Sequence, residues 1–259
     1  MGKCLFLRSC ILWGAVVAAM LSPAAATAQQ GGTVVSLAWY SPAQPVHASA
    51  MSTLASEILV RTSVEALAME KSLSSLEQFY SYPLVFWPLA SDLPTLKREE
   101  AVVLGQWLRS GGTLVLDWTG GAAHIEQAKL ALDGLVSAIL PGAQVERVPK
   151  SSVLYRTFYR VTYAPGRTRL VEDLFAVSYG GRYAIIITYN DMLAAFERNS
   201  EGQYRRDVVP GGEQQREDAI RLGVNILLYA LCLDYKDDRI HMDYLKSKRN
   251  WRLPVDDGQ

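Results

Sequence analysis

Cysteine is scarce in this chain, with three residues among 259. Two of them, Cys4 and Cys10, fall in an amino-terminal stretch that we expect to be removed, which leaves Cys232 as the single thiol. One thiol cannot form an internal disulfide, so we expect the protein to be held together by packing alone. Cys232 lies in the apolar run 227–233, where we predict a small buried side chain and not a nucleophile.

Sequence motifs of common enzyme classes are also missing. The chain has no Gly-x-Ser-x-Gly nucleophile elbow and no glycine-rich phosphate-binding loop. One cluster near the carboxyl terminus contains residue types that can bind metal ions. Transition-metal sites, however, usually contain more closely spaced histidine and cysteine ligands. We interpret this cluster as a solvated acidic turn, and we expect no metal and no other cofactor. It comprises Asp237, Asp238, His241 and Asp243.

Neither sign of charge is in excess. Lysine and arginine together number 26, as do aspartate and glutamate, so the formal net charge is zero. A nucleic-acid-binding protein neutralises phosphates with a basic surface, so we expect no nucleic-acid partner. The carboxyl-terminal tail is locally basic, and we expect it to be solvated, with contact to anionic lipid or to a partner protein as the alternative. Its basic residues are Lys246, Lys248, Arg249 and Arg252.

The first residues have the pattern of an export signal. A basic start precedes an apolar run at residues 11–21 and the small-x-small site Ala26-Thr27-Ala28. These features predict a signal peptide over residues 1–28, cleaved near Ala28, and a single α/β domain over residues 29–259. The apolar run is shorter than the roughly 20 residues that a spanning helix needs. We therefore expect an exported protein that contacts the membrane only through an uncleaved signal or the basic tail.

Strands and helices alternate along the rest of the chain. Two continuously apolar stretches flank a helix that we expect Thr95 to cap and Gly111-Gly112 to end. Gly180-Gly181 separates two later strands, which is a strong hairpin signal. The pattern predicts an α/β fold with a doubly wound, mostly parallel sheet and an added antiparallel hairpin. The expected strands are 33–39, 61–67, 84–87, 113–117, 171–179 and 182–189, and the expected helices include 48–60, 125–139, 190–197 and 213–233.

Several short motifs occur in an order that resembles a bacterial family, domain-of-unknown-function family 4159. They are Arg61-Thr62-Ser63-Val64, Tyr82-Pro83, Trp87-Pro88, Leu108-Arg109-Ser110-Gly111-Gly112 with Leu116-Asp117, Gly181-Arg182, Asn190-Asp191, Arg221-Leu222-Gly223-Val224-Asn225-Ile226 with Tyr229-Ala230-Leu231, and Tyr235-Lys236-Asp237-Asp238-Arg239-Ile240-His241. The resemblance implies a fold similar to class I glutamine amidotransferases, a setting in the bacterial cell envelope and no established activity. Family members often carry Asp-His-Pro where this chain has Ser151-Ser152-Val153. We therefore expect no role for that histidine here.

Aromatic and polar residues follow the predicted parallel strands. Because the carboxyl ends of such strands share one edge of the sheet, we expect these residues to converge there. Aromatic rings can stack on sugars, while carboxylates and amides bind hydroxyl groups, which favours a carbohydrate-like or peptidoglycan-derived ligand. In the alternative interpretation the rings pack under covering loops, and Asp117 and Asn190 cap the next helices. The candidate ligand-binding residues at this edge are Trp39, Tyr40, Trp87, Asp117, Trp118, Thr119, Asn190 and Asp191.

Candidates for chemistry are few. The turn after Asp117 carries no thiol where an amidotransferase would have its nucleophile, so we do not expect glutamine hydrolysis. Asp117 is the one candidate general acid or base, and His124 is a weaker candidate base beside it. Arg182 follows the hairpin turn and is a candidate for binding an anion, although pairing with a carboxylate of its own sheet is the commoner role.

These observations favour a non-catalytic ligand- or partner-binding module of the bacterial cell envelope, located in the periplasm. Its expected partners are envelope proteins or a carbohydrate-like ligand. The alternative is a hydrolase that acts on sugars or peptidoglycan-derived substrates and uses Asp117. A structural subunit that binds a membrane-anchored partner is a third hypothesis, which an exposed apolar patch would support.

Asn225 and Gly223 stand out in the last apolar helix. An unpaired buried amide costs roughly 1–3 kcal/mol, and a helical glycine costs about 1 kcal/mol relative to alanine. We therefore predict that this helix lies flat on the sheet, with Gly223 at a close contact. We also predict that Asn225 is hydrogen-bonded to the backbone of the sheet or of an adjoining loop, with a structural role.

Overall fold

The computed structural model of the protein describes residues 34–41, 48–62, 64–69, 72–90 and 95–248. The predicted signal peptide 1–28 lies outside the described residues. So do the side chains of the acidic cluster 237–243 and of the basic tail. Within the described part of the chain, no helix combines the length and the apolar character that crossing a bilayer requires.

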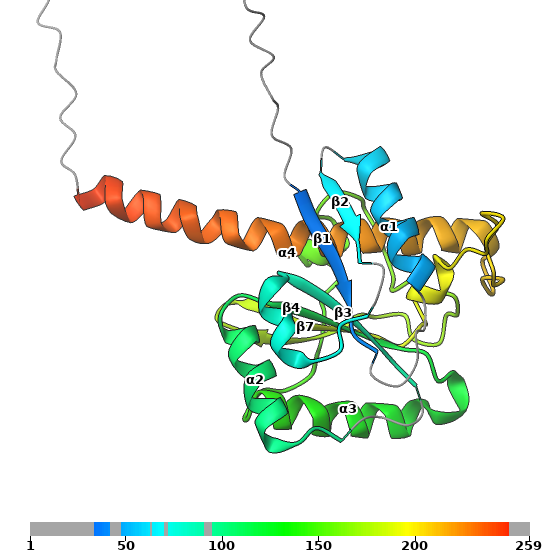
Figure 1. Cartoon of the computed structure of the whole chain (residues 1–259), viewed down its shortest axis with the longest axis horizontal. Helices are drawn as coiled ribbons and strands as arrows, with labels where there is room; N and C mark the ends of the chain where they lie inside the picture. Colours follow the sequence, from blue (N-terminus) through cyan, green and yellow to red (C-terminus); the bar gives the residue numbers. More distant parts are fainter. Residues whose placement is uncertain (1–33, 42–47, 63, 70–71, 91–94, 249–259) are drawn as a thin grey trace, which may run out of the picture. The chain divides into compact units, whose positions relative to one another are not determined.

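The secondary-structure elements alternate through the described residues (Figure 1). The strands are β1 (Val34–Trp39), β2 (Glu65–Ala68), β3 (Leu84–Leu89), β4 (Thr113–Trp118), β5 (Glu146–Arg147), β6 (Phe175–Tyr179) and β7 (Arg182–Thr188). The α-helices are α1 (Ala48–Arg61), α2 (Arg98–Arg109), α3 (Ile125–Ile139) and α4 (Gly212–Lys248). Short 3-10 helices are η1 (Leu76–Ser81), η2 (Ala122–His124), η3 (Val153–Tyr155) and η4 (Leu193–Ala195).

The strands form one seven-stranded sheet in the order β2-β1-β3-β4-β7-β6-β5. The pairs from β2 through β7 are parallel, while β6 pairs antiparallel with both β7 and β5. β2 follows β1 in the chain and lies on one side of it in the sheet, whereas β3 lies on the other side of β1. The topological switch point of the sheet is therefore between β1 and β3. The predicted mostly parallel sheet with an antiparallel hairpin is confirmed.

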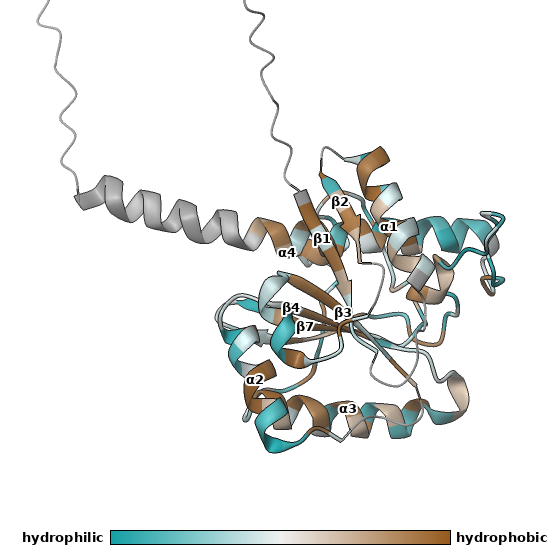
Figure 2. Cartoon of the chain, viewed as in Figure 1, coloured by the Kyte–Doolittle hydropathy of each residue, from teal (hydrophilic) through white to brown (hydrophobic). Residues whose placement is uncertain are grey.

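Helices cover both faces of this sheet, which explains the unbroken apolar sequences of its central strands. One hydrophobic core joins a face of the sheet to α1 and α4, and the other joins the opposite face to α2 and α3. Each residue of β4 is buried, because its side chains meet one core or the other in alternation. Figure 2 shows these central strands as hydrophobic ribbon between helices of mixed character.

Several element boundaries differ from those expected: β6 begins at Phe175 and α4 continues to Lys248, and three other differences have a visible cause. Arg61 ends α1 instead of starting a strand, and the strand begins only at Glu65. Thr95 does not cap α2, because the helix begins three residues later and the Glu100 carboxylate accepts the Lys97 backbone N–H at 2.7 Å. The helix expected over 190–197 is reduced to the short η4, because its first two residues are held in other contacts described below.

The predicted hydrogen bonding of Asn225 to the backbone of an adjoining loop is confirmed. Its side chain is fully buried, and Oδ1 accepts the N–H groups of Phe158 and Tyr159 at 3.0 and 2.8 Å. Nδ2 donates to the carbonyls of Leu154 and Tyr159 at 3.1 and 2.8 Å. The Asn225 amide therefore accepts two hydrogen bonds from, and donates two to, the backbone of η3 and the loop that follows it.

The expected close contact at Gly223 is present, but the neighbour is not a strand. A Cβ at this position would lie 2.9 Å from Leu54 Cδ1 of α1 and 3.4 Å from Phe196 Cζ. The prediction that Cys232 is buried is wrong, since its side chain is exposed. At helical spacing, Cys232 falls beside the buried stripe of α4, which ends with Ile226, Leu227 and Ala230.

Candidate functional site

The aromatic residues at the carboxyl edge of the sheet are built into the two cores. Trp39, Trp87 and Trp118 are almost fully buried, and Tyr40 is nearly so. The Tyr40 ring meets Trp87 edge-to-face, with centroids 4.9 Å apart, and the Trp118 indole N–H donates to the Gly121 carbonyl at 3.1 Å. These rings therefore pack as the alternative interpretation supposed, and their faces are not presented to solvent as a stacking platform.

Asp117, near the end of β4, caps a later element of the chain. Its Oδ1 accepts the Met192 N–H and its Oδ2 accepts the Leu193 N–H, each at 2.8 Å. The side chain is fully buried. Burial and the neighbouring Asp191 carboxylate raise the pKa of Asp117, while the two backbone hydrogen bonds oppose that rise. The carboxylate thus fixes the start of η4 and presents neither oxygen to solvent.

Asn190 anchors the segment that covers this edge. Its Nδ2 donates to the carbonyls of Ala164 and Val171, both at 2.6 Å. Its Oδ1 accepts the N–H groups of Leu170 and Val171 at 2.8 and 3.0 Å. Gly166 packs so closely that a Cβ there would lie 2.1 Å from the Asn190 carbonyl oxygen. The amide is therefore committed to holding residues 164–171 over the strand ends.

Asp191 and Thr119 link the ends of neighbouring strands at this edge of the sheet. Asp191 adopts a positive φ of 55°, and its carboxylate forms an ion pair with the Arg167 guanidinium. Its N–H donates to the Trp118 carbonyl at 3.1 Å, which joins the end of β7 to the end of β4. Thr119 donates through both its N–H and its hydroxyl to the Leu89 carbonyl, at 2.8 and 3.1 Å. Neighbouring strand ends are thus linked directly to one another.

Arg182 and His124 lie apart from this group. Arg182 begins β7, so it lies at the amino edge of the parallel strands, opposite Asp117. Its guanidinium donates to the Leu108 and Gly112 carbonyls at the end of α2. His124 is exposed at the end of η2, whereas Asp117 is fully buried. Arg182 therefore does not share an edge of the sheet with the residues at the strand ends.

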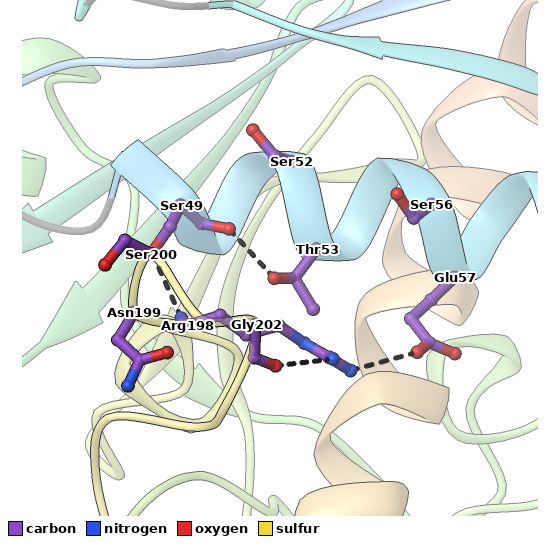
Figure 3. Close-up of a pocket in the computed structure, with 9 residues that line it drawn as sticks. All are labelled: Ser49, Ser52, Thr53, Ser56, Glu57, Arg198, Asn199, Ser200 and Gly202. Atoms are coloured by element: carbon purple, nitrogen blue, oxygen red, sulfur yellow. Dashed lines mark hydrogen bonds and ion pairs between the residues drawn. The ribbon is translucent and has the colours of Figure 1, made fainter.

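A groove that the sequence reasoning missed lies between α1 and the loop after η4 (Figure 3). Its volume is about 390 Å³. Hydroxyl groups dominate its lining, together with one carboxylate, one guanidinium and one amide. The lining residues are Ser49, Ser52, Thr53, Ser56, Glu57, Arg198, Asn199, Ser200 and Gly202. Serines recur at positions 49, 52 and 56, which is helical spacing. This recurrence in the sequence could have indicated a polar helix face, which forms one wall of the groove.

Arg198 connects the two walls of the groove. Its backbone N–H donates to Ser49 Oγ at 3.1 Å, and its guanidinium donates to the Gly202 carbonyl at 3.0 Å. The same guanidinium lies 3.9 Å from the Glu57 carboxylate, as drawn in Figure 3. Ser52 and Ser56 are exposed, and their hydroxyls make no hydrogen bond to any other described residue. These two hydroxyls are available to a ligand.

The loop wall is held in place from behind. The buried Glu197 carboxylate accepts hydrogen bonds from Arg205 and Arg206, each at 3.0 Å. The Tyr204 ring lies between the guanidinium groups of Arg198 and Arg216, which are 4.3 and 3.9 Å from its centroid. The groove is therefore largely preformed, which lowers the entropic cost of binding.

An ion-pair network extends from Glu57, a lining residue of the groove, to α4. Arg61 donates to Glu57 at 2.8 Å and forms two parallel bonds to Glu217, at 2.7 and 2.8 Å. Hydrogen bonding to Arg61 holds the pKa of Glu217 below its ordinary value of 4.5. The network ties α1 to α4. Among the described residues, no group of three or more histidine, cysteine or acidic side chains is placed to hold a metal ion.

Comparison with known proteins gives one positive finding. No curated protein matches the chain. The sequence model of one family matches residues 36–231, a range that begins within β1 and ends within α4. The matched range includes the groove, the closed carboxyl edge and the Asn225 anchor. The chain therefore belongs to the family described as domain of unknown function (DUF4159).

Proposed function

We propose that this protein is a non-catalytic ligand- or partner-binding module of the bacterial cell envelope, and that its ligand binds in the groove between α1 and residues 198–202. The observation that carries the proposal is the presence of two exposed hydroxyls, Ser52 and Ser56, beside the fixed Arg198–Glu57 pair. Hydroxyl, carboxylate and guanidinium groups together donate to and accept from a polyhydroxylated ligand.

The charged pair favours a ligand that itself carries charge. A guanidinium binds carboxylates, and a carboxylate accepts from ammonium or hydroxyl groups. A peptidoglycan-derived fragment carries hydroxyl, amide and carboxylate groups in one molecule, and it matches this lining. The predicted signal peptide supports export to the periplasm, where such fragments are found. The glutamine amidotransferase-like form of the fold remains an inference, supported by the mostly parallel sheet.

Binding to the purified protein tests the proposal. Calorimetric titration with soluble muropeptides should give saturable binding, and Ser52→Trp should weaken it at least about tenfold by filling the groove. Gln127→Trp, an equally large change on an exposed position of α3, is the matched control and should leave affinity unchanged. The proposal fails if no muropeptide binds, or if the two variants behave alike.

The hydrolase alternative depends on Asp117. The double capping of η4 counts against it, because a substrate would have to displace the Met192 and Leu193 amides. Asp117→Asn places an amide N–H₂ against one of those backbone donors, so it should lower the free energy of unfolding by about 2 kcal/mol. Turnover of a panel of glycoside and amide substrates that disappears in a folded Asp117→Asn protein would instead favour the hydrolase.

A further inference from the structure

A second concave surface lies at the amino edge of the sheet. It is a cleft of about 250 Å³ between the end of η1 and the turn that joins α2 to β4. Its lining residues are Tyr80, Ser81, Tyr82, Pro83, Trp107, Ser110, Gly111 and Gly112. Both lining segments directly precede a strand, β3 or β4, so the cleft is at the opposite end of these strands from Asp117.

Hydrogen bonds between the two sides fix the width of this cleft. The Trp107 indole N–H donates to the Tyr82 carbonyl at 3.1 Å, and the Thr113 N–H donates to the Pro83 carbonyl at 2.8 Å. From β7, Arg182 donates to the Gly112 carbonyl at 3.0 Å and supports the turn. The cleft is thus preformed, and a ligand would not have to order its walls.

The floor of the cleft requires glycine. A Cβ on Gly112 would lie 2.1 Å from Trp107 Cε2, so the indole ring rests directly against the backbone of the turn. Gly111 has a φ of 116°, a conformation that residues with a Cβ rarely adopt. The tight turn and the buried indole therefore pack directly against each other at this cleft.

The lining of the cleft is neutral, aromatic and rich in hydroxyl groups. No lining residue is charged. The Tyr80 side chain is 51% exposed, and the exposed Ser81 hydroxyl makes no hydrogen bond to any other described residue. Ser110 Oγ donates to the Trp107 carbonyl at 2.8 Å and keeps its lone pairs for a ligand donor. This lining suits a neutral molecule with one apolar face and several hydroxyl groups.

We propose that this cleft binds one neutral sugar residue of a glycan, which packs on the Tyr80 ring and hydrogen-bonds to Ser81 and Ser110. The volume is below the roughly 300–1,000 Å³ of pockets that enclose a drug-sized ligand, which fits a single ring. Amphipathic aromatic side chains provide apolar contact area for such a ring. This cleft shares no lining residue with the groove beside α1, whose lining is charged.

Titration of the isotope-labelled protein with the neutral trimer of N-acetylglucosamine tests the proposal. The backbone amide resonances of residues 110–112 should shift saturably. Tyr80→Ala should weaken binding about tenfold by removing one wall. Tyr179→Ala is the matched control, because Tyr179 is 40% exposed and lies in the hairpin but does not line the cleft. Ser52→Trp, which blocks the groove, should also leave trimer binding unchanged.

A second variant keeps the test decisive if Tyr80→Ala fails to fold. Ser81→Arg introduces a long charged side chain at an exposed lining position and should abolish trimer binding without loss of structure. The proposal is overturned if the trimer causes no saturable shift, if Tyr179→Ala weakens binding as much as Tyr80→Ala, or if only a proline-rich peptide, the other common occupant of aromatic grooves, binds here.

Discussion

Asn225→Leu offers the sharpest test of how this fold is held together. The side chain makes four hydrogen bonds to the loop 154–159, and leucine of similar size can make none. The substitution leaves two backbone donors and two backbone carbonyls without these partners. It removes no apolar contact of comparable size, so the expected effect is mainly the loss of polar pairing.

The size of the effect follows from those four bonds. Each contributes a net 0.5–1.5 kcal/mol, roughly, and a buried group left unpaired costs about 1–3 kcal/mol. Phe158 is exposed, so water can reach part of the loop after the substitution. We expect a decrease of about 3 kcal/mol in the free energy of unfolding, which corresponds to a melting temperature about 6–12 °C lower for a domain of this size.

Urea unfolding followed by circular dichroism and tryptophan fluorescence provides the measurement. Gln214→Leu is the matched control, because it changes an exposed amide on the same helix and should alter stability by less than about 0.5 kcal/mol. Equal stability of the two variants would refute the reasoning. Unchanged stability of Asn225→Leu together with lost ligand binding would place Asn225 in a binding site instead.

Two further predictions concern the ion-pair network and the closed carboxyl edge. Because Arg61 holds the pKa of Glu217 below 4.5, their pair should stabilise the fold above that pH, and its contribution should disappear as the pH falls through the lowered pKa. Glu217→Gln should therefore be less stable than the native protein at neutral pH and equally stable in acid, which urea unfolding across this pH range will measure. A difference in stability that does not depend on pH would contradict the stabilising role of the Arg61–Glu217 pair. Gly166→Ala should cost about 3 kcal/mol, since its Cβ meets the Asn190 carbonyl oxygen at 2.1 Å, whereas Gly134→Ala in α3, with nothing within 4 Å, should be neutral or stabilising by thermal melting. Similar melting temperatures for these two alanine variants would show that residues 164–171 can shift to accommodate the added methyl group at little cost in free energy.

The features that could be predicted from the sequence depend on neighbours in the chain. The apolar run 114–116 indicated a strand covered on both faces, and Gly180-Gly181 indicated the hairpin. The helix Ile125–Ile139 agrees with its predicted bounds at both ends. In these places local periodicity and turn chemistry agree with the packing, and so they were sufficient.

The candidate site depended on distant contacts, which local patterns do not encode. Asp117 was recognised as a residue at a strand end, but its partners are amides 75 and 76 positions later. The groove forms where Arg198 meets Ser49, 149 positions apart, and no local motif joins them. Asn225 was an exception, because a buried amide requires partners wherever they lie, and that requirement could be stated without knowing the fold.

The pairing of α1 with α4 has a consequence for how the chain folds. The bidentate bond between Arg61 and Glu217 joins residues 156 positions apart, and Gly223 packs on Leu54 across a similar separation. Contacts of such long range close slowly, because the loop between them must be ordered first. During synthesis the apolar face of α1 emerges well before the helix that covers it. The apolar face of α1 is therefore open to aggregation until α4 has been synthesised. A fragment that ends before Gly212, where α4 begins, should remain incompletely folded.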